Sequence, residues 1–465
     1  MQAFDRQVLT RLPLAEAMWT LLRYVVTPSF ASELFESHRG TGSERLIEFG
    51  TLVELVGEAL TQHGGSGRQS FEAAKRDGRL AATVRAVYGK LGRIPARLSQ
   101  AFLREATARL NAVLPEPTAA LPASLREFHV VAVDGKNIKR VAKRLKVLCG
   151  HTSGMLGGKG VVALSLNSHL AIAMQASLNG DANDAPLFSP LLEQVEALLP
   201  QAVLYVADRQ FCDLTIPPKI VQQGSHVLIR FSQKMRFFPD ETGPYASRTS
   251  EDRNGRLITQ EWGWLGIASA KQRMFVRRIT LSRPDEEDVS LITDLLDAES
   301  YPAQDLLDTY LQRWTIERVF QQVTEVFQLQ RLIGTTPQGT VFQFSLCLWF
   351  YNLMQVLRAE VADIEQRPIA TISSELMFRD VCNQLVAGDL LLDRSALLKR
   401  FADDLSPEHV RARLRALLSG RWTTAWLKAP AKRQPGPRPQ QPAEKGTHAS
   451  VWKLIQAAKT ASHPP

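Results

Sequence analysis

The sequence predicts an α/β core that carries an all-β insertion and is flanked by helical regions on both sides. Three observations lead to this fold class. Short apolar segments rich in β-branched residues alternate with helix-like segments from residue 125 to residue 335. A polar and aromatic stretch, residues 232–288, interrupts this alternation and contains Asn254-Gly255, a common hairpin turn. Residues 1–120 and 336–427 show mainly helical periodicity.

Length and composition describe a globular protein of more than one structural unit. The chain has 465 residues, of which 45% are hydrophobic and 22% are charged. Its four cysteines are scattered and form no Cys-x2-Cys pair, which argues against a disulfide framework or a zinc site. The most apolar window, residues 341–357, is short for a membrane span and includes Gln and Asn, so it is predicted to be a buried helix. The first residues contain no apolar signal segment, and we therefore expect a cytoplasmic protein without a membrane partner.

The formal net charge of +9 is unevenly distributed along the chain. Residues 1–115 contain 15 Lys and Arg against 11 Asp and Glu, and residues 428–465 contain 7 against 1, whereas the chain between them is nearly balanced. Basic flanks favour contact with a polyanion, although solubility alone would also account for them. The basic, Pro-rich tail over residues 428–465 is predicted to be disordered, with a short amphipathic helix over residues 451–461.

The N-terminal region, residues 1–120, is predicted to be helical. Helices are expected over residues 13–24, 43–62, 70–91 and 94–110. Their basic residues have two interpretations. In the first, they contact DNA phosphates, and the region binds DNA ends. In the second, they form the solvated face of an ordinary helical bundle, which is favoured by the absence of a helix-turn-helix signature in the sequence.

Two predicted strands of the core are followed by aspartate. The first covers residues 128–133 and precedes Asp134-Gly135, and the second covers residues 203–207 and precedes Asp208. A carboxylate at the end of a buried strand is typical of an active-site edge. For Asp134 the alternative is an Asp-Gly turn without chemistry.

The other core elements complete a mixed order of strands and helices. A hairpin of two strands is expected over residues 161–166 and 171–177. Further helices are expected over residues 185–199 and 216–223, and further strands over residues 227–230 and 289–296. A hairpin followed by alternating strands and helices indicates a sheet of the ribonuclease-H kind.

A basic segment directly follows the first aspartate. It contains six cations in eleven residues: Lys136, Lys139, Arg140, Lys143, Arg144 and Lys146. This density of charge suits the phosphate backbone of DNA. Lys136, Lys139 and Arg140 are therefore candidate DNA-binding residues.

One helix, predicted over residues 306 to about 329, carries a third acid beside a cation and a phenol. Tyr310, Arg313 and Glu317 are spaced three and four residues apart, so they share one face of the helix. Such a face suits a metal-bound phosphate, and a solvated, salt-bridged helix surface is the alternative.

Asp134, Asp208 and Glu317 together can hold two divalent cations, because carboxylate, water and phosphate oxygens complete an octahedral shell. Two such ions support in-line phosphoryl transfer without a nucleophilic side chain. The sequence contains no nucleophile elbow, Walker loop or metal-binding His pair. We therefore predict that these three carboxylates are both the catalytic residues and the ligands of two Mg²⁺ ions, with Mn²⁺ as a substitute.

These motifs resemble those of DDE transposases from bacterial insertion sequences of the family 4 type. In that branch a ribonuclease-H-like core carries a β insertion, and the third acid lies in a Tyr-x2-Arg-x3-Glu-x6-Lys signature. Tyr310, Arg313 and Glu317 match three of the signature positions. Val133-Asp134-Gly135 resembles the first acid motif, and Ala207-Asp208-Arg209 resembles the second.

The resemblance implies cut-and-paste DNA transposition: cleavage of the phosphodiesters at transposon ends and transfer of the 3′-OH into target DNA. It implies double-stranded inverted-repeat ends and target DNA as partners, a dimer in the synaptic complex, and a location at the bacterial nucleoid. By the same resemblance, Tyr310 and Arg313 bind end phosphates, and Trp262 and Trp264 are candidates to stack on a flipped base.

The sequence departs from the signature at its fourth position, where Thr324 replaces Lys. Arg318 and Arg331 are candidates to supply the missing cation. Because of this departure, two alternatives are kept beside an active transposase. One is a catalytically impaired, DNA-binding transposase remnant, and the other is a two-metal DNA nuclease without strand transfer.

Overall fold

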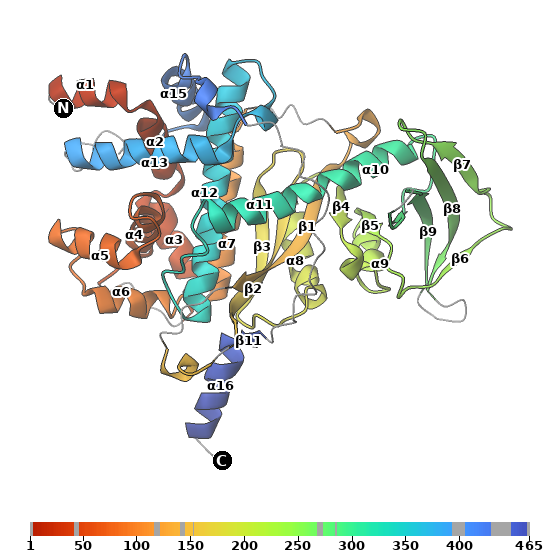
Figure 1. Ribbon diagram of the computed structural model, residues 1–465, viewed down its shortest axis with the longest axis horizontal. Helices are drawn as coiled ribbons and strands as arrows, with labels where there is room; N and C mark the ends of the chain where they lie inside the picture. Colours follow the sequence, from red (N-terminus) through yellow and green to blue (C-terminus); the bar gives the residue numbers. More distant parts are fainter. Residues whose placement is uncertain are drawn as a thin grey trace.

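The computed structural model describes residues 3–40, 46–115, 121–139, 145–151, 153–266, 273–283, 286–392, 405–428 and 448–462. Figure 1 shows a helical region on one side, a sheet in the centre, and a group of antiparallel strands on the far side of the sheet. Most of the tail predicted to be disordered, residues 429–447, lies outside the described residues.

Helices make up most of the described chain up to residue 111. They are α1 (Ala3–Arg11), α2 (Pro13–Val25), α3 (Pro28–His38), α4 (Phe49–Thr61), α5 (Gly67–Arg76), α6 (Val84–Leu91) and α7 (Ala96–Asn111). The single helix expected over residues 70–91 is thus replaced by α5 and α6. Gly78 takes a left-handed φ of 72° after α5, and the Thr83 hydroxyl accepts the Ala86 N–H at 3.2 Å to begin α6.

The centre of the molecule is a mixed sheet. Its first strands are β1 (His129–Lys139), β2 (Met155–Ser165), β3 (Ala171–Ser177), β4 (Val203–Ala207) and β5 (His226–Arg230). β1, β2 and β3 pair antiparallel, whereas β4 pairs parallel with β1, and β5 pairs parallel with β4. Helix α8 (Ala185–Leu198) leads from β3 to β4, and α9 (Ile216–Gln222) connects the parallel strands β4 and β5. This mixed α/β arrangement is consistent with a ribonuclease-H-like domain.

β1 is longer than the predicted strand over residues 128–133, and Asp134 is therefore inside a strand. The antiparallel partner β2 continues to pair with β1 as far as Lys139, whereas the parallel partner β4 ends at the pair Val133 and Ala207. Asp134 thus follows the last residue of β1 that β4 pairs. The sequence could not predict this, because the length of β1 is set by its partner.

Antiparallel strands extend the sheet beyond β5. They are β6 (Phe237–Pro239), β7 (Arg248–Glu251), β8 (Leu257–Leu265), β9 (Met274–Leu281) and β10 (Val289–Thr293). β10 pairs with both β5 and β9, so these strands continue the central sheet. The assignment of residues 232–288 as an insertion into the core remains a prediction.

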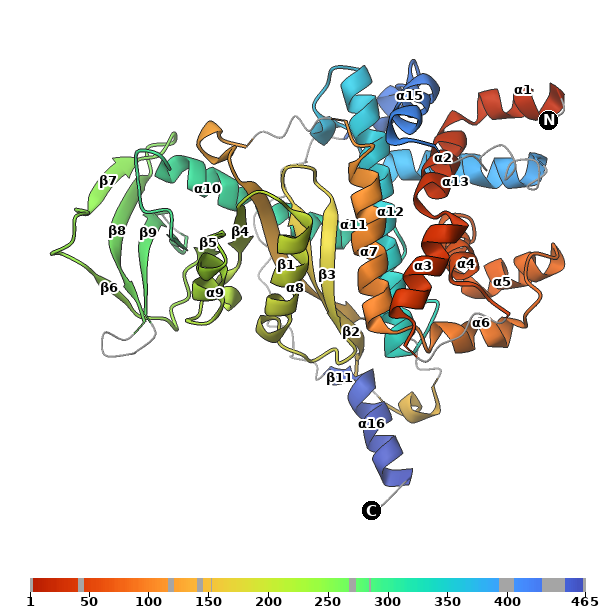
Figure 2. The same cartoon turned by 180° about the vertical axis from the view of Figure 1, so that it is seen from behind.

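Two layers of helices cover opposite faces of the sheet. Helices α10 (Ala303–Gln312) and α11 (Trp314–Glu325) cross in front of it in Figure 1, and α8 and α9 lie in front of it in the reverse view of Figure 2. Alternate residues of each strand point to opposite faces of the sheet and pack into different hydrophobic clusters. Ala132 and Val206 belong to one cluster, and Val133 and Ala207 belong to the other.

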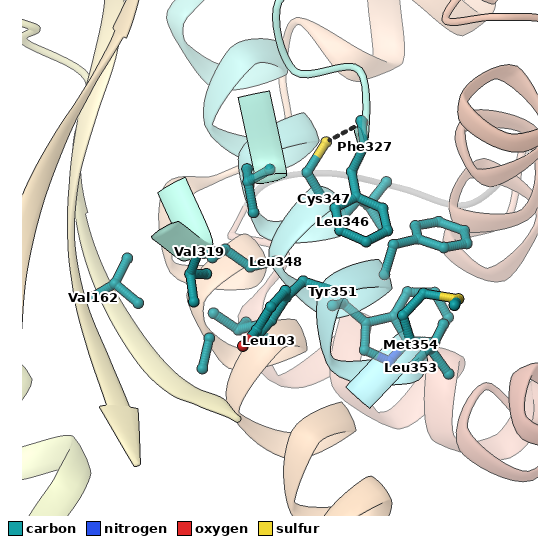
Figure 3. Packing of buried hydrophobic residues seen from close by; sticks show 14 of the residues in the cluster. Leu103, Val162, Val319, Phe327, Leu346, Cys347, Leu348, Tyr351, Leu353 and Met354 are labelled. Carbon is teal, nitrogen blue, oxygen red and sulfur yellow. Dashed lines mark hydrogen bonds between the residues drawn. The ribbon is translucent and has the colours of Figure 1, made fainter. Parts of the chain in front are cut away.

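Helix α12 (Pro337–Ile364) joins the helical region to the sheet. It is apolar and long enough to span a membrane, but its most apolar window is entirely buried within the protein, as predicted for residues 341–357. Figure 3 shows its residues Leu348 and Tyr351 near Leu103 of α7 and Val319 of α11, with Val162 of β2 on the far side of Val319. The Cys347 thiol donates a hydrogen bond to the Phe327 carbonyl at 3.1 Å. A single hydrophobic core therefore spans both regions.

The C-terminal part contains further helices and returns to the sheet. The helices are α13 (Ser374–Leu391), α15 (Pro407–Leu418) and α16 (Val451–Ser462), and β11 (Ala449–Ser450) pairs parallel with β2. Short 3₁₀ turns cover Ala123–Leu125, Lys146–Leu148, Arg209–Phe211, Ile369–Thr371 and Thr424–Trp426. Val451 is buried, so the start of α16 packs against the body of the protein, and the rest of α16 extends away from it (Figures 1 and 2).

Candidate active site

Asp134 and Asp208 lie side by side at one edge of the parallel strands. They directly follow the paired residues Val133 and Ala207, and neighbouring strands are about 4.8 Å apart. Val133 and Ala207 face the core under α8, and Asp208 retains an extended backbone. By strand alternation, both carboxylates therefore point to the opposite face, which α11 covers.

The third acid comes from α11. The single helix predicted over residues 306 to about 329 is two helices, α10 and α11, with Arg313 at the junction. Its φ of −52° and ψ of −36° are helical, so α11 continues nearly in line with α10 across the sheet (Figure 1). Tyr310 and Arg313 are each 4% exposed, whereas the Glu317 side chain is 39% exposed.

Arg313 links two of the three acids. Its Nη2 atom lies 3.0 Å from Glu317 Oε1, and its Nη1 atom lies 3.9 Å from Asp134 Oδ2. The Gly135 backbone N–H also donates to Asp134 Oδ1 at 2.8 Å. The structure thus gathers Asp134 and Glu317 around one guanidinium group, and Asp208 raises the pKa of the same group from nearby.

The pKa shifts reflect burial and the crowding of charged groups. Burial raises the pKa of Asp134 from 3.8 to about 6; Gly135 and Arg313 oppose this shift, and Glu317 and Asp208 add to it. Burial also raises the pKa of Tyr310 to about 12. For Arg313, burial lowers the pKa, but Tyr310, Asp208 and Glu317 outweigh burial and raise it above its ordinary value. Positive charge beside Asp134, such as that of Arg313, therefore favours its ionised form.

Next to Asp134, the backbone of β1 at Gly135 packs against the ion pair of Asp184 and Lys159, which the sequence did not suggest. A Cβ atom on Gly135 would overlap the Asp184 carboxylate, so any larger residue there would require that side chain to move. Asp184 is buried and lies 2.5 Å from Lys159 Nζ of β2. The only signal in the sequence was the glycine that follows Asp134.

Lys136 is the predicted basic residue that lies beside α11. It is half-buried, and its Nζ atom lies 5.8 Å from the centre of the Phe320 ring. Burial and Lys139 lower the pKa of Lys136, whereas Glu325 and Asp134 raise it. Lys139 is exposed, and Arg140 lies outside the described residues.

Thr324 and the two arginines considered as substitutes for the missing signature Lys make hydrogen bonds with other parts of the chain. Thr324 donates to the Phe320 carbonyl at 2.6 Å. Arg331 donates to the Gly64 carbonyl at 2.7 Å and packs against Gly65, in the loop before α5. Arg318 is exposed and donates to Thr315 Oγ1 at 3.2 Å.

The predicted tryptophans lie on β8. Trp262 is buried, donates its indole N–H to the Leu296 carbonyl at 2.8 Å and stacks on Tyr245. Trp264 is partly exposed, and the Arg273 guanidinium lies 4.0 Å from its ring centre. These contacts do not join either ring to the three acids.

Sequence reasoning missed a tryptophan next to the site. Trp314 is 50% exposed, and the Arg313 guanidinium lies 4.9 Å from its ring centre. Its signal was an aromatic residue in the middle of the charged stretch from Tyr310 to Glu317.

The donor atoms suit a hard cation, although they do not form a closed metal site. Across the described residues, no group of three or more His, Cys, Asp and Glu side chains is arranged to hold a metal. Carboxylate oxygens are nevertheless the ligands that Mg²⁺ prefers, and Asp208 Oδ1 is buried without a hydrogen-bond partner among the described residues. The residues therefore fit a divalent cation chemically, while Arg313 supplies the positive charge between Asp134 and Glu317.

One known family matches part of the chain. Residues 127–353 match the family described as the transposase DDE domain. The matched segment runs from just before β1 into α12 and contains Asp134, Asp208 and Glu317. A search of the curated proteins finds no match. The family match supports a DDE transposase, an enzyme that acts on DNA.

Proposed function

We propose that the protein is a metal-dependent transposase that cleaves the phosphodiesters at transposon ends and joins the freed 3′-OH to target DNA. One observation carries this proposal: carboxylates on β1 and α11 contact a single buried guanidinium, and the carboxylate that directly follows β4 is close enough to raise its pKa, within the segment that matches the transposase DDE domain. The branch we assign is the insertion-sequence type with the Tyr-x2-Arg-x3-Glu signature.

In this proposal Asp134, Asp208 and Glu317 hold the divalent cations. When bound, two Mg²⁺ ions, or Mn²⁺ in their place, activate the attacking oxygen and stabilise the leaving oxygen of in-line phosphoryl transfer. The chain's own contribution is placement. Strand pairing fixes the two aspartates side by side, and Arg313 holds Glu317 toward Asp134.

Lys136 is our candidate for the cation that position 324 lacks. It reaches α11 from β1, beside Phe320 and close enough to Glu325 for that carboxylate to raise its pKa. Lys139 and Arg140 extend the basic segment along the DNA backbone. Because Trp314 is exposed beside Arg313, we assign it a contact with a DNA base at the cleaved end, with Trp264 as the candidate on β8.

The remaining assignments follow from the same function. Residues 1–120 bind the transposon ends, and residues 232–288 are the β insertion of the catalytic core over residues 125–335. The active complex pairs two ends and is therefore at least a dimer, formed in the cytoplasm on nucleoid DNA. Transposition by cut and paste is the mechanism that we assign.

The three acids provide the test. Asp134→Asn, Asp208→Asn and Glu317→Gln are each expected to abolish Mg²⁺-dependent cleavage of duplex DNA carrying the inverted repeats that flank the gene, with DNA binding nearly retained. Glu193→Gln is the matched control, because Glu193 is an exposed carboxylate on α8 whose ion pair, within the described part of the chain, is with Lys219. Cleavage by all three variants at the control rate would contradict the assignment.

A second measurement separates transposase from nuclease. A pre-cut end that carries a free 3′-OH is expected to be joined to target DNA by the natural protein. Cleavage without joined products would identify the protein as a nuclease. DNA binding without cleaved or joined products would identify it as a DNA-binding remnant.

A further inference from the structure

The guanidinium of Arg313 occupies the place of a cation among the three acids. It is 4% exposed, contacts Glu317 at 3.0 Å and lies 3.9 Å from Asp134. Asp208 is near enough to raise its pKa. A buried guanidinium needs such counter-charges, and the crowded carboxylates equally need a positive charge.

A divalent cation would compete with this arrangement. Mg²⁺ binds carboxylate oxygens at about 2.0–2.1 Å and uses their lone pairs. Glu317 Oε1 already accepts a hydrogen bond from Arg313 Nη2, so a cation that bound to this oxygen would have to compete with the guanidinium. Two positive centres so close together also repel each other strongly where water is scarce.

Arg313 has a second surface to lie against. It stands at the junction of α10 and α11, next to the half-exposed ring of Trp314, whose centre is 4.9 Å from the guanidinium. Arginine stacks on aromatic faces and binds phosphate through two parallel hydrogen bonds. A DNA phosphate at this exposed ring would therefore draw Arg313 away from Asp134 and Glu317.

We propose that Arg313 is a built-in competitor of the metal, which holds the carboxylates in the DNA-free protein and releases them when it binds a DNA phosphate. This rests on the proposed function, since it concerns the same acids. It makes metal binding and DNA binding mutually reinforcing, because each ligand favours the same position of Arg313. The DNA-free protein therefore binds the metal weakly, and its metal affinity rises when a DNA end is bound.

The competition predicts opposite effects of one substitution. Arg313→Gln removes the positive charge but keeps a polar side chain at the junction. In the full-length chain without DNA, it is expected to bind Mn²⁺ about five- to tenfold more tightly than the natural protein, while DNA cleavage falls. Arg313→Lys keeps the charge and is the matched control, with an affinity near that of the natural protein.

Mn²⁺ affinity is measured by calorimetric titration and by the electron paramagnetic resonance signal of free Mn²⁺, with circular dichroism to verify that each variant is folded. Short duplex DNA is then expected to tighten Mn²⁺ binding to the natural protein and to leave Arg313→Gln almost unchanged. Unchanged or weaker Mn²⁺ binding by Arg313→Gln would overturn the inference.

Asp134→Asn separates this inference from the proposed function. If it abolishes Mn²⁺ binding and Arg313→Gln has no effect, the metal site stands and only the competition is overturned. If Asp134→Asn leaves Mn²⁺ binding intact, the metal-site assignment fails, and the inference fails with it.

Discussion

At the scale of single residues, the ionised carboxylate of Asp134 lowers the stability of the folded protein. Its carboxyl group is mostly buried, and burial is the largest cause of its raised pKa. Two further acids make its ionisation still less favourable. A neutral side chain at this position would make the fold more stable. Buried acids with strongly raised pKa values are common at functional sites, so Asp134 is a candidate to bind a ligand.

The pH dependence of stability follows from the direction of this shift. The folded pKa of about 6 lies above the value of 3.8 for an ordinary Asp, so the folded state binds the proton more tightly than the unfolded state does. The contribution of Asp134 to stability is therefore complete below pH 4 and is lost as the pH rises through 6. The difference of about two between the folded and unfolded pKa values corresponds to roughly 3 kcal/mol, reduced by the remaining contact of Asp134 with solvent.

Asp134→Asn is thus expected to stabilise the metal-free protein at pH 7.5, by about 1–3 kcal/mol, and to have little effect at pH 4. Urea unfolding in the presence of a chelator at both pH values measures this. Glu193→Gln, at an exposed position on α8, serves as the comparison and should change neither value. A loss of stability in Asp134→Asn at pH 7.5 would show that the ionised carboxylate does not lower the stability of the folded protein.

At the scale of elements, the sequence predicted what local pattern and charge determine. The strand over residues 203–207 is β4, and the acid after it lies where the prediction placed it. Local pattern did not give the end of β1, because β2 extends it to Lys139. It also did not give the contacts of Lys136 with α11 or of Gly135 with Asp184, because these join segments far apart in the chain.

The pairing of β1 with α11 yields a prediction for Lys136. Lys136→Met keeps the aliphatic stem over Phe320 but removes the charge, so folding should be preserved. Binding to end DNA is expected to weaken, and the slope of log affinity against log salt should fall by about one unit, as for one lost phosphate contact. Fluorescence anisotropy over a series of salt concentrations measures the slope.

A second substitution tests whether Lys136 takes the role of the absent signature Lys. Thr324 lies one turn after Phe320 on α11, where its hydroxyl bonds to the Phe320 carbonyl. Thr324→Lys in the Lys136→Met background is expected to restore the salt slope. If Lys136→Met leaves the slope unchanged, the cation comes from elsewhere.

At the scale of the whole molecule, the helical region and the sheet share one interior. The principal core cluster includes Leu21 of α2, Leu103 of α7, Val162 of β2 and Val451 of α16. Helix α12 lies between these parts, with every residue from Val341 to Arg358 buried. The three acids are therefore supported by a hydrophobic core that extends well beyond residues 125–335. The periodicity of the sequence could not indicate this shared core.

Asn352 is the polar link in this shared core, and its loss should be costly. Its Oδ1 accepts the Ala171 N–H of β3 at 2.9 Å, and its Nδ2 donates to the Ala171 carbonyl at 2.9 Å and to Thr107 Oγ1 of α7 at 2.8 Å. Asn352→Leu has nearly the same size but leaves these buried groups without that partner. Each unsatisfied group costs about 1–3 kcal/mol, so we expect a loss of roughly 3 kcal/mol in the free energy of unfolding.

Urea unfolding of Asn352→Leu measures this loss, with Asn111→Leu at the exposed end of α7 as the matched control, which should change stability by less than about 0.5 kcal/mol. Because Asn352 ties α12 to both α7 and β3, the lower stability should appear in helix and sheet signals together, as one transition. Equal stability of the two variants would mean that apolar packing alone joins the parts. Loss of the sheet signal at lower urea than the helix signal would mean that the two regions unfold separately, and the acids would then depend on the sheet alone for their placement.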